Sequence, residues 1–110
     1  MSFSQKYWYN IDMEEKETTL AEYMDELAET LASVNDSALL KDFLKAILTP
    51  QEYSAVASRW ALVRLLDSGM TQRKISETLG LSLCKITRGS KEMKKEQSSF
   101  RKMIDIYKSL

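Results

Sequence analysis

The residues with the clearest chemical capacity lie between residues 70 and 95, where cations and short polar side chains are concentrated. Residues 71–95 carry seven Lys and Arg residues against two acids, a net charge of +5, whereas residues 12–36 carry nine acids against one lysine, a net charge of −8. The chain as a whole has no net charge. A local cluster of cations can bind phosphates even when the whole chain is neutral. The alternative is that each charged run is only a solvated surface.

Other residue types exclude most catalytic chemistry. The chain has no His, and Cys84 is its single cysteine, so it lacks the commonest general base, an internal disulfide and a thiolate metal cluster. It also has no Gly-rich phosphate loop and no Ser or Cys paired with a base. The sequence therefore predicts a binding protein, with no enzymatic activity, no metal site and no cofactor.

Location and organisation are predicted from the apolar pattern. No apolar run approaches the ~20 residues of a membrane span, and the first residues lack a secretory signal. We therefore expect a cytoplasmic protein without a membrane partner. Residues 1–16, which contain four aromatic side chains, are predicted to form a flexible arm, and residues 17–110 a helical domain.

Local signals predict an all-α fold. A first helix is expected to begin at Thr19 with a capping box to Glu22, and a second after Asn35 or Asp36. A third helix is expected from the sequence LTPQE at 48–52, with Gly69 as its left-handed cap. Its broad apolar stripe predicts a central, buried helix. A final helix is expected over about 97–109, and no segment alternates like a strand.

Residues 70–94 match the physical demands of a helix-turn-helix. Two short helices, about 71–79 and 82–92, are joined at Gly80, which tolerates positive φ. Ser76 is small enough for a close helix crossing, and Ser82 can cap the second helix. Gly89 is expected to break or distort that helix near its end. The apolar residues that would form a small core between the helices are Ile75, Leu79, Leu81 and Ile86.

In such a motif the N-terminal part of the second helix enters the major groove of DNA. The alternative is an ordinary helical hairpin with solvated charges. Cys84 is expected to be a small exposed side chain at the groove, and redox sensing is its alternative role. The candidate DNA-binding residues are Gln72, Arg73, Leu83, Cys84, Lys85, Thr87, Arg88, Ser90 and Lys91.

Particular motifs carry a family resemblance. The segments LTPQE (48–52), MTQR (70–73), LG (79–80) and ITRGS (86–90), together with Arg59, resemble the Trp repressor family over roughly residues 48–95. The resemblance implies an intertwined six-helix homodimer with a helix-turn-helix reading head. It also implies a repressor that binds a palindromic double-stranded DNA operator and uses L-tryptophan as its corepressor.

The same resemblance implies the ligand site. The indole would lie between Arg59 and Arg88, because a guanidinium pairs with carboxylates and stacks on aromatic rings. The implied ligand-binding residues are Ala46, Leu48, Thr49, Arg59, Arg88, Gly89 and Glu92. Without a ligand, Arg88 would be a phosphate contact, and Arg59 would pair with Glu52 or Asp42.

Departures from the family pattern keep other functions open. Lys91 and Glu92 stand where the family carries Asn and then a Ser that helps to hold the ligand ammonium. Ala46 replaces a larger Leu, and one residue before Gly69 is missing. The alternatives are a repressor-like DNA binder with another ligand or none, and a helical protein–protein interaction module whose acidic first helices bind a partner protein.

Overall fold

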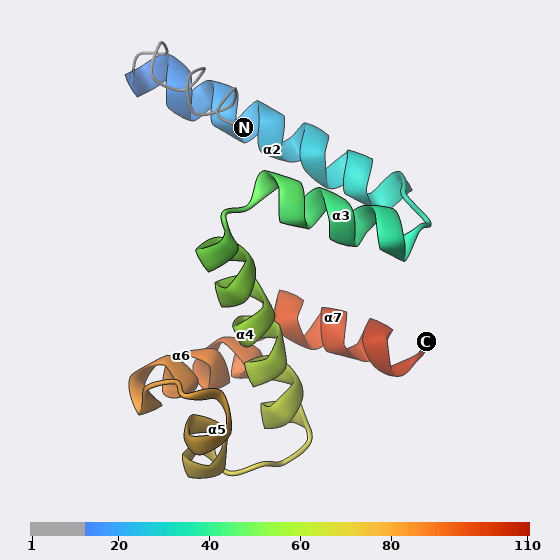
Figure 1. Cartoon of the computed structure of the whole chain (residues 1–110). Coiled ribbons are helices and arrows are strands. Elements are labelled where there is room, and N and C mark those ends of the chain that lie inside the picture. The colour runs from blue at the N-terminus through green and yellow to red at the C-terminus, as the bar shows by residue number, and fades with distance from the viewer. Residues whose placement is uncertain (1–12) are drawn as a thin grey trace. The chain divides into compact units, whose positions relative to one another are not determined.

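The computed structural model describes the backbone from Met13 and the side chains from Thr19 to Leu110. This part of the chain contains helices and no strand (Figure 1), which confirms the all-α prediction. The predicted aromatic arm lies largely outside the described residues. The helices are α2 (Met13–Ser33), α3 (Ser37–Ile47), α4 (Pro50–Asp67), α5 (Gln72–Leu79), α6 (Leu83–Lys94) and α7 (Ser99–Lys108). They form two compact units that divide between Leu44 and Lys45.

Helix α2 begins at Met13, so the prediction that the first helix starts at Thr19 is wrong. Residues 13–17 are Met, Glu and Lys, which have high intrinsic helix propensity, and nothing in this stretch stops a helix. Thr19 therefore lies inside the helix rather than at its cap. For α3 the prediction holds, because the Asp36 carboxylate accepts hydrogen bonds from the backbone N–H groups of Ala38 and Leu39 at 3.1 and 3.2 Å.

Both ends of α4 are fixed by local chemistry. The Thr49 hydroxyl accepts a hydrogen bond from the Glu52 N–H at 3.1 Å, and the Glu52 carboxylate accepts one from the Thr49 N–H at 2.8 Å. This reciprocal pair is the predicted capping box. At the other end Gly69 has φ +89°. Its N–H donates to Leu66 and that of Met70 donates to Leu65, the two bonds of a Schellman cap.

Helix α4 is the centre of the second unit, since it packs against α5, α6 and α7. Its C-terminal half supplies two buried residues, Leu62 and Val63, one to each of two apolar clusters. The N-terminal half has no buried residue, and Val56 in that half and Trp60 in the C-terminal half are exposed in the single chain. The prediction of a central, buried helix is therefore confirmed for its central place, but its burial is confirmed only at Leu62 and Val63.

The two clusters hold different partners of α4. Leu62 packs with Ile75 of α5 and Ile86 of α6, both fully buried. Val63 packs with Met93 of α6 and Ile104 of α7. The first cluster thus fixes the α5–α6 hairpin on α4, and the second fixes α7.

Polar contacts strengthen the attachment of α7. The Asp67 carboxylate accepts a hydrogen bond from Arg101 at 2.6 Å and lies 3.3 Å from the Lys108 ammonium. The Arg64 guanidinium lies 4.0 Å from the ring centroid of Tyr107, a cation–π distance. The hydrogen bond from Arg101 holds the pKa of Asp67 below its usual value, with a further lowering by Lys108 and an opposing effect of partial burial.

Candidate functional site

The hairpin of α5 and α6 closes through a turn that the sequence specifies. Gly80 has φ +66°, the left-handed conformation expected there. The Ser76 hydroxyl donates to the Leu81 carbonyl at 2.7 Å, so the small residue at the helix crossing also ties the turn. The Ser82 side chain accepts from the Lys85 N–H and caps α6. These contacts, with the buried cluster beneath them, confirm the predicted helix-turn-helix geometry.

A side-chain contact joins the two helices at the outer surface. The Thr87 hydroxyl lies 3.2 Å from the side-chain oxygen of Gln72 and donates a hydrogen bond to it. Gln72 is the first residue of α5, and Thr71 caps that helix by accepting from the Lys74 N–H. Two of the candidate DNA-binding residues are therefore held together although fifteen positions separate them in the chain.

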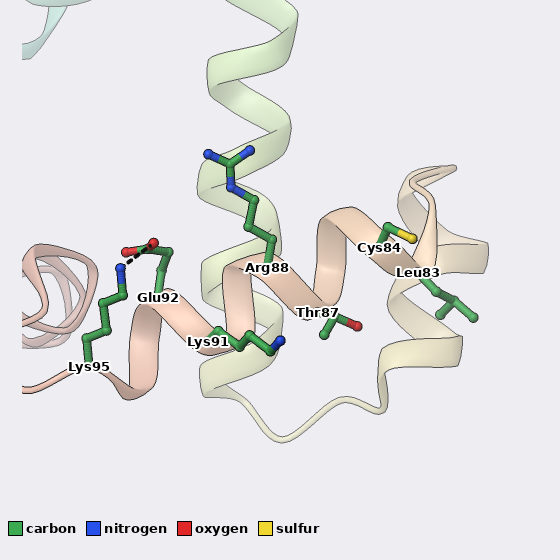
Figure 2. A pocket seen from close by; sticks show the side chains of 7 residues that line it. All are labelled: Leu83, Cys84, Thr87, Arg88, Lys91, Glu92 and Lys95. Carbon is green, nitrogen blue, oxygen red and sulfur yellow. Dashed lines mark hydrogen bonds and ion pairs between the residues drawn. The ribbon is translucent and has the colours of Figure 1, made fainter.

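One side of α6 presents an open, partly charged surface, which we call the outer face of α6. Figure 2 shows its side chains projecting from successive turns of the helix. The residues that line it are Leu83, Cys84, Thr87, Arg88, Lys91, Glu92 and Lys95. Five of the nine candidate DNA-binding residues thus share this face. Arg73 is exposed on α5, and Ser90 is half-buried and lies off the outer face.

The other side of α6 and the facing side of α4 enclose a pocket of about 650 Å³, which we call the α4–α6 pocket. This volume falls in the range of small-molecule sites. Its described lining residues are Gln51, Ser54, Ala55, Ser58, Arg59, Leu62, Val63, Leu81, Lys85, Arg88, Gly89, Glu92 and Phe100.

The α4–α6 pocket brings together four of the seven candidate ligand residues: Arg59 from α4, and Arg88, Gly89 and Glu92 from α6. The other three, Ala46, Leu48 and Thr49, are not among the residues that line it. Arg88 and Glu92 line both the pocket and the outer face of α6. These two side chains therefore stand at the border between the two surfaces.

Lys85 occupies a place that the sequence analysis missed. It was predicted only as a DNA-binding residue, yet it lines the α4–α6 pocket and not the outer face of α6. Helical spacing indicates this position of Lys85, because residues 85, 89 and 92 lie on the same side of an α-helix. Because Gly89 and Glu92 were already ligand candidates, Lys85 belonged on the same side.

The prediction that Gly89 breaks the helix is wrong. Helix α6 continues without interruption to Lys94, and Gly89 is buried. A Cβ atom at this position would lie 2.9 Å from Cδ2 and 3.4 Å from Cγ of Leu62. Gly89 therefore allows α6 to pack closely on α4, and this contact sets the floor of the pocket.

The charges around the pocket are mostly positive. Arg59, Lys85 and Arg88 face one carboxylate, that of Glu92. Among side chains 19–110, neither arginine has an ion-pair partner, and Glu52 accepts from the Thr49 backbone rather than from Arg59. Glu92 pairs instead with Lys95 at 2.8 Å, as Figure 2 shows. The two arginines thus remain available to an anionic group.

The described residues contain no group of three or more His, Cys, Asp or Glu side chains placed to hold a metal ion. None of the described helices combines the length and the apolar character needed to cross a membrane.

Known proteins are similar in sequence to this chain over most of its helices. The family model described as Trp repressor protein matches residues 22–107, a longer stretch than the motifs at 48–95. The Trp operon repressor homolog of Chlamydia trachomatis serovar L2 is 38% identical over 66 residues, 59% of this chain and 70% of that protein. That of Actinobacillus succinogenes is 38% identical over 73 residues, 66% and 72% of the two chains. That of Vibrio vulnificus is 46% identical over 52 residues, 46% and 51%. No solved structure matches the chain.

Proposed function

The chain belongs to the Trp repressor protein family, a family of transcriptional repressors and not of enzymes, and we propose that it represses transcription as an L-tryptophan-dependent homodimer on a palindromic DNA operator. The observation that carries the proposal is the position of Arg88, which lines both the outer face of α6 and the α4–α6 pocket. One side chain is thus placed to contact DNA on one side and a ligand on the other.

The outer face of α6 is the proposed DNA-binding surface. Its capped N-terminus, exposed Leu83 and Cys84 and half-buried Thr87 suit entry into the major groove. Arg88 and Lys91 suit phosphates at its edge. Gln72, held by Thr87, and Arg73 lie at the start of α5, where backbone and side-chain donors commonly bind phosphate. Lys85 and Ser90 are proposed to contribute from the flanks of the helix.

The α4–α6 pocket is the proposed corepressor site. Arg59 and Arg88 come from different helices, and both lack an acidic partner among the described side chains. An aromatic amino acid can stack on both guanidinium groups and pair its carboxylate with one. Gly89 keeps α6 close to α4 through its contact with Leu62, and Glu92 is proposed to face the ligand ammonium. Such a ligand favours one position of α6 relative to α4 and shifts the population toward it.

A second copy of the chain is proposed to complete the pocket. Ala46, Leu48 and Thr49 do not line the pocket of their own chain. Helix α3 has no buried residue, and large apolar side chains of α3, α4 and α7 are exposed. An intertwined homodimer would cover these side chains and would bring the three residues to the partner's pocket.

Two alanine variants test the proposal. Arg88→Ala is expected to abolish measurable L-tryptophan binding in calorimetry and to weaken DNA binding. Lys91→Ala is the control, because Lys91 lines only the outer face of α6. It is expected to lower the salt dependence of DNA binding by about one phosphate contact and to leave the ligand affinity unchanged. For the unchanged chain we expect a ligand Kd from micromolar to sub-millimolar, about −5 to −8 kcal/mol.

The DNA-binding experiment selects bound duplexes from a random pool, with and without L-tryptophan. Unchanged ligand binding in Arg88→Ala would contradict the assignment of the pocket. Enrichment of the same duplexes without the ligand would favour a repressor with another ligand or none. DNA affinity that does not fall with salt would favour the protein–protein interaction module.

A further inference from the structure

The α4–α6 pocket carries more positive charge than an ordinary amino acid can neutralise. Its described lining residues include three cations, Arg59, Lys85 and Arg88, and one carboxylate, that of Glu92. This carboxylate already pairs with Lys95, which does not line the pocket. At neutral pH an amino acid with an uncharged side chain is a zwitterion and brings no net charge. The surplus of cations therefore remains when such a ligand binds.

Lys85 is the cation that local structure explains least. It is the third residue of α6, in the first turn, where the helix dipole favours acidic side chains and disfavours cations. Glu52 holds the same position in α4 and closes a capping box with its carboxylate, which a lysine cannot do. Lys85 also lies one turn before Arg88, and like charges at this spacing repel each other. Among side chains 19–110 it has no acidic partner, so an anion bound beside it would offset these costs.

The order of charged residues along α6 indicates where such an anion would lie. Lys85, Arg88 and Glu92 all line the pocket, and α6 is continuous from Leu83 to Lys94. At about 1.5 Å per residue, Lys85 lies about 10 Å from Glu92 along the helix axis. In the proposed binding mode the ligand ammonium faces Glu92 and the ring stacks on Arg88. The edge of the ring farthest from the ammonium then lies toward Lys85.

On the basis of the proposed ligand site, we infer that Lys85 forms a second anion subsite of the α4–α6 pocket, which accepts an acidic group in addition to the carboxylate of an aromatic amino acid. This group is a carboxylate or a phosphate, borne by the ligand ring or supplied by a free anion bound beside it. Gln51, Ser54 and Ser58 of α4 also line the pocket, so further hydrogen-bond donors are present. The pocket therefore distinguishes aromatic amino acids by the charge on the ring.

The first experiment varies the charge of the ligand at constant size, by isothermal calorimetry on the full chain without DNA. Its probes are 6-carboxy-L-tryptophan and the matching 6-carboxamide. We expect the unchanged protein to bind the carboxylate roughly three- to fivefold more tightly, the effect of one partly exposed ion pair. Lys85→Gln is expected to bring the two affinities to within about 1.5-fold, because the ion pair is lost. Lys85→Arg keeps the cation and should keep the preference.

The second experiment tests a free anion as the source. Line broadening in phosphorus NMR measures the binding of inorganic phosphate to the protein in the presence of L-tryptophan. We expect broadening that Lys85→Gln reduces. The 6-carboxylate should also reduce it, because that ligand fills the subsite with its own acid, whereas the 6-carboxamide should not.

Lys74→Gln is the control in both experiments. Lys74 is an exposed lysine of α5 that lines neither the α4–α6 pocket nor the outer face of α6. This variant removes the same charge from the chain as Lys85→Gln does. It should keep both the carboxylate preference and the phosphate broadening of the unchanged protein.

The results for the subsite and for the proposed corepressor are distinguishable. A carboxylate preference that depends on Lys85 supports an acid borne by the ligand, and phosphate broadening that depends on Lys85 supports a free anion. Heat from L-tryptophan with neither result, or equal losses in Lys85→Gln and Lys74→Gln, would overturn the subsite and leave the corepressor site standing. Heat from 6-carboxy-L-tryptophan but not from L-tryptophan would support the subsite and contradict the proposed corepressor. Absence of heat with all three indole ligands would overturn both.

Discussion

Gly89 decides how closely α6 approaches α4. Its absent side chain accommodates Leu62, and that leucine packs on the fully buried Ile86. A glycine inside a helix costs about 1 kcal/mol relative to alanine. The local rule therefore predicts a break, and the close contact with Leu62 offsets that cost. Sequence alone did not reveal the contact, because it joins residues twenty-seven positions apart.

Gly89→Val is expected to lower the free energy of unfolding by about 2 kcal/mol or more, because the new methyl groups must displace Leu62 in a packed core. Lys91→Val is the control, since it puts the same side chain on the exposed side of α6 and should change stability by less than about 0.5 kcal/mol. Urea unfolding measures both. A loss of equal size in the two variants would show that valine weakens the helix itself and that the contact with Leu62 is unimportant.

The candidate ligand residues show which parts of the site the family resemblance predicts and which it misses. Arg59 and Arg88 line the same pocket, and their role as ligand residues stays a prediction. Helical periodicity places Lys85 on the pocket side of α6, but the helix-turn-helix prediction assigned it only to DNA. Ala46 does not line this pocket, and in the proposed homodimer a second chain would bring it there, which local sequence patterns do not predict.

Among the helices, the ends were predicted best. The capping box of Thr49 and Glu52, the left-handed Gly69 and the cap of Ser82 are all contacts within a few residues. Such contacts are encoded by neighbouring residue types. The start of α2 was missed because a good local cap at Thr19 does not end a helix that the preceding residues can continue.

The ion pairs between Asp67 of α4 and the cations of α7 make the free energy of unfolding depend on pH. Asp67 binds Arg101 and Lys108, and its pKa is lowered, so its contribution to stability is complete above the usual value of 3.8 and is lost as the pH falls through the lower native value. Asp67→Asn is therefore expected to be less stable than the unchanged protein at neutral pH. Denaturant unfolding between pH 2 and pH 7, on the order of ten points, should show this difference vanishing at the acidic end.

Asp105→Asn is the control for that titration, because Asp105 is an exposed acid on α7 without an ion pair among the described side chains. The free energy of unfolding of Asp105→Asn should match that of the unchanged protein at every pH in the titration. A constant gap between Asp67→Asn and the unchanged protein from pH 2 to pH 7 would mean that the carboxylate charge does not fasten α7.

For the whole molecule, the exposed apolar surface is the main unexplained feature of a single chain. In the second unit Trp60, Met103, Ile106 and Tyr107 are each more than a third exposed, and Leu39 and Ile47 of α3 are about half exposed. In the second unit the rings of Trp60 and Tyr107 adjoin, with centroids 6.2 Å apart, and clustered apolar surface of this kind marks an interaction site. Helical periodicity predicted these faces as apolar, but it did not distinguish burial within the chain from burial against a second copy.

Ile106→Asp tests the proposed homodimer. Ile106 is 57% exposed in the single chain, so the charge should be tolerated in a monomer but should raise the dimer dissociation constant at least roughly 10-fold if a second copy covers it. Leu83→Asp is the control, since Leu83 is 53% exposed and lies on the outer face of α6. Sedimentation equilibrium should show weakened association only for Ile106→Asp. The same association constant for all three proteins would place α7 outside the dimer interface.

The position of Arg88 between two surfaces also constrains how the proposed repressor responds to the concentration of L-tryptophan. When two ligands share a contact residue, thermodynamic linkage makes their coupling reciprocal. If L-tryptophan raises the affinity for the operator by some factor, the operator raises the affinity for L-tryptophan by that same factor. The protein on its operator would therefore respond at a lower concentration of amino acid than the free protein, and its threshold would depend on how many operators the cell contains.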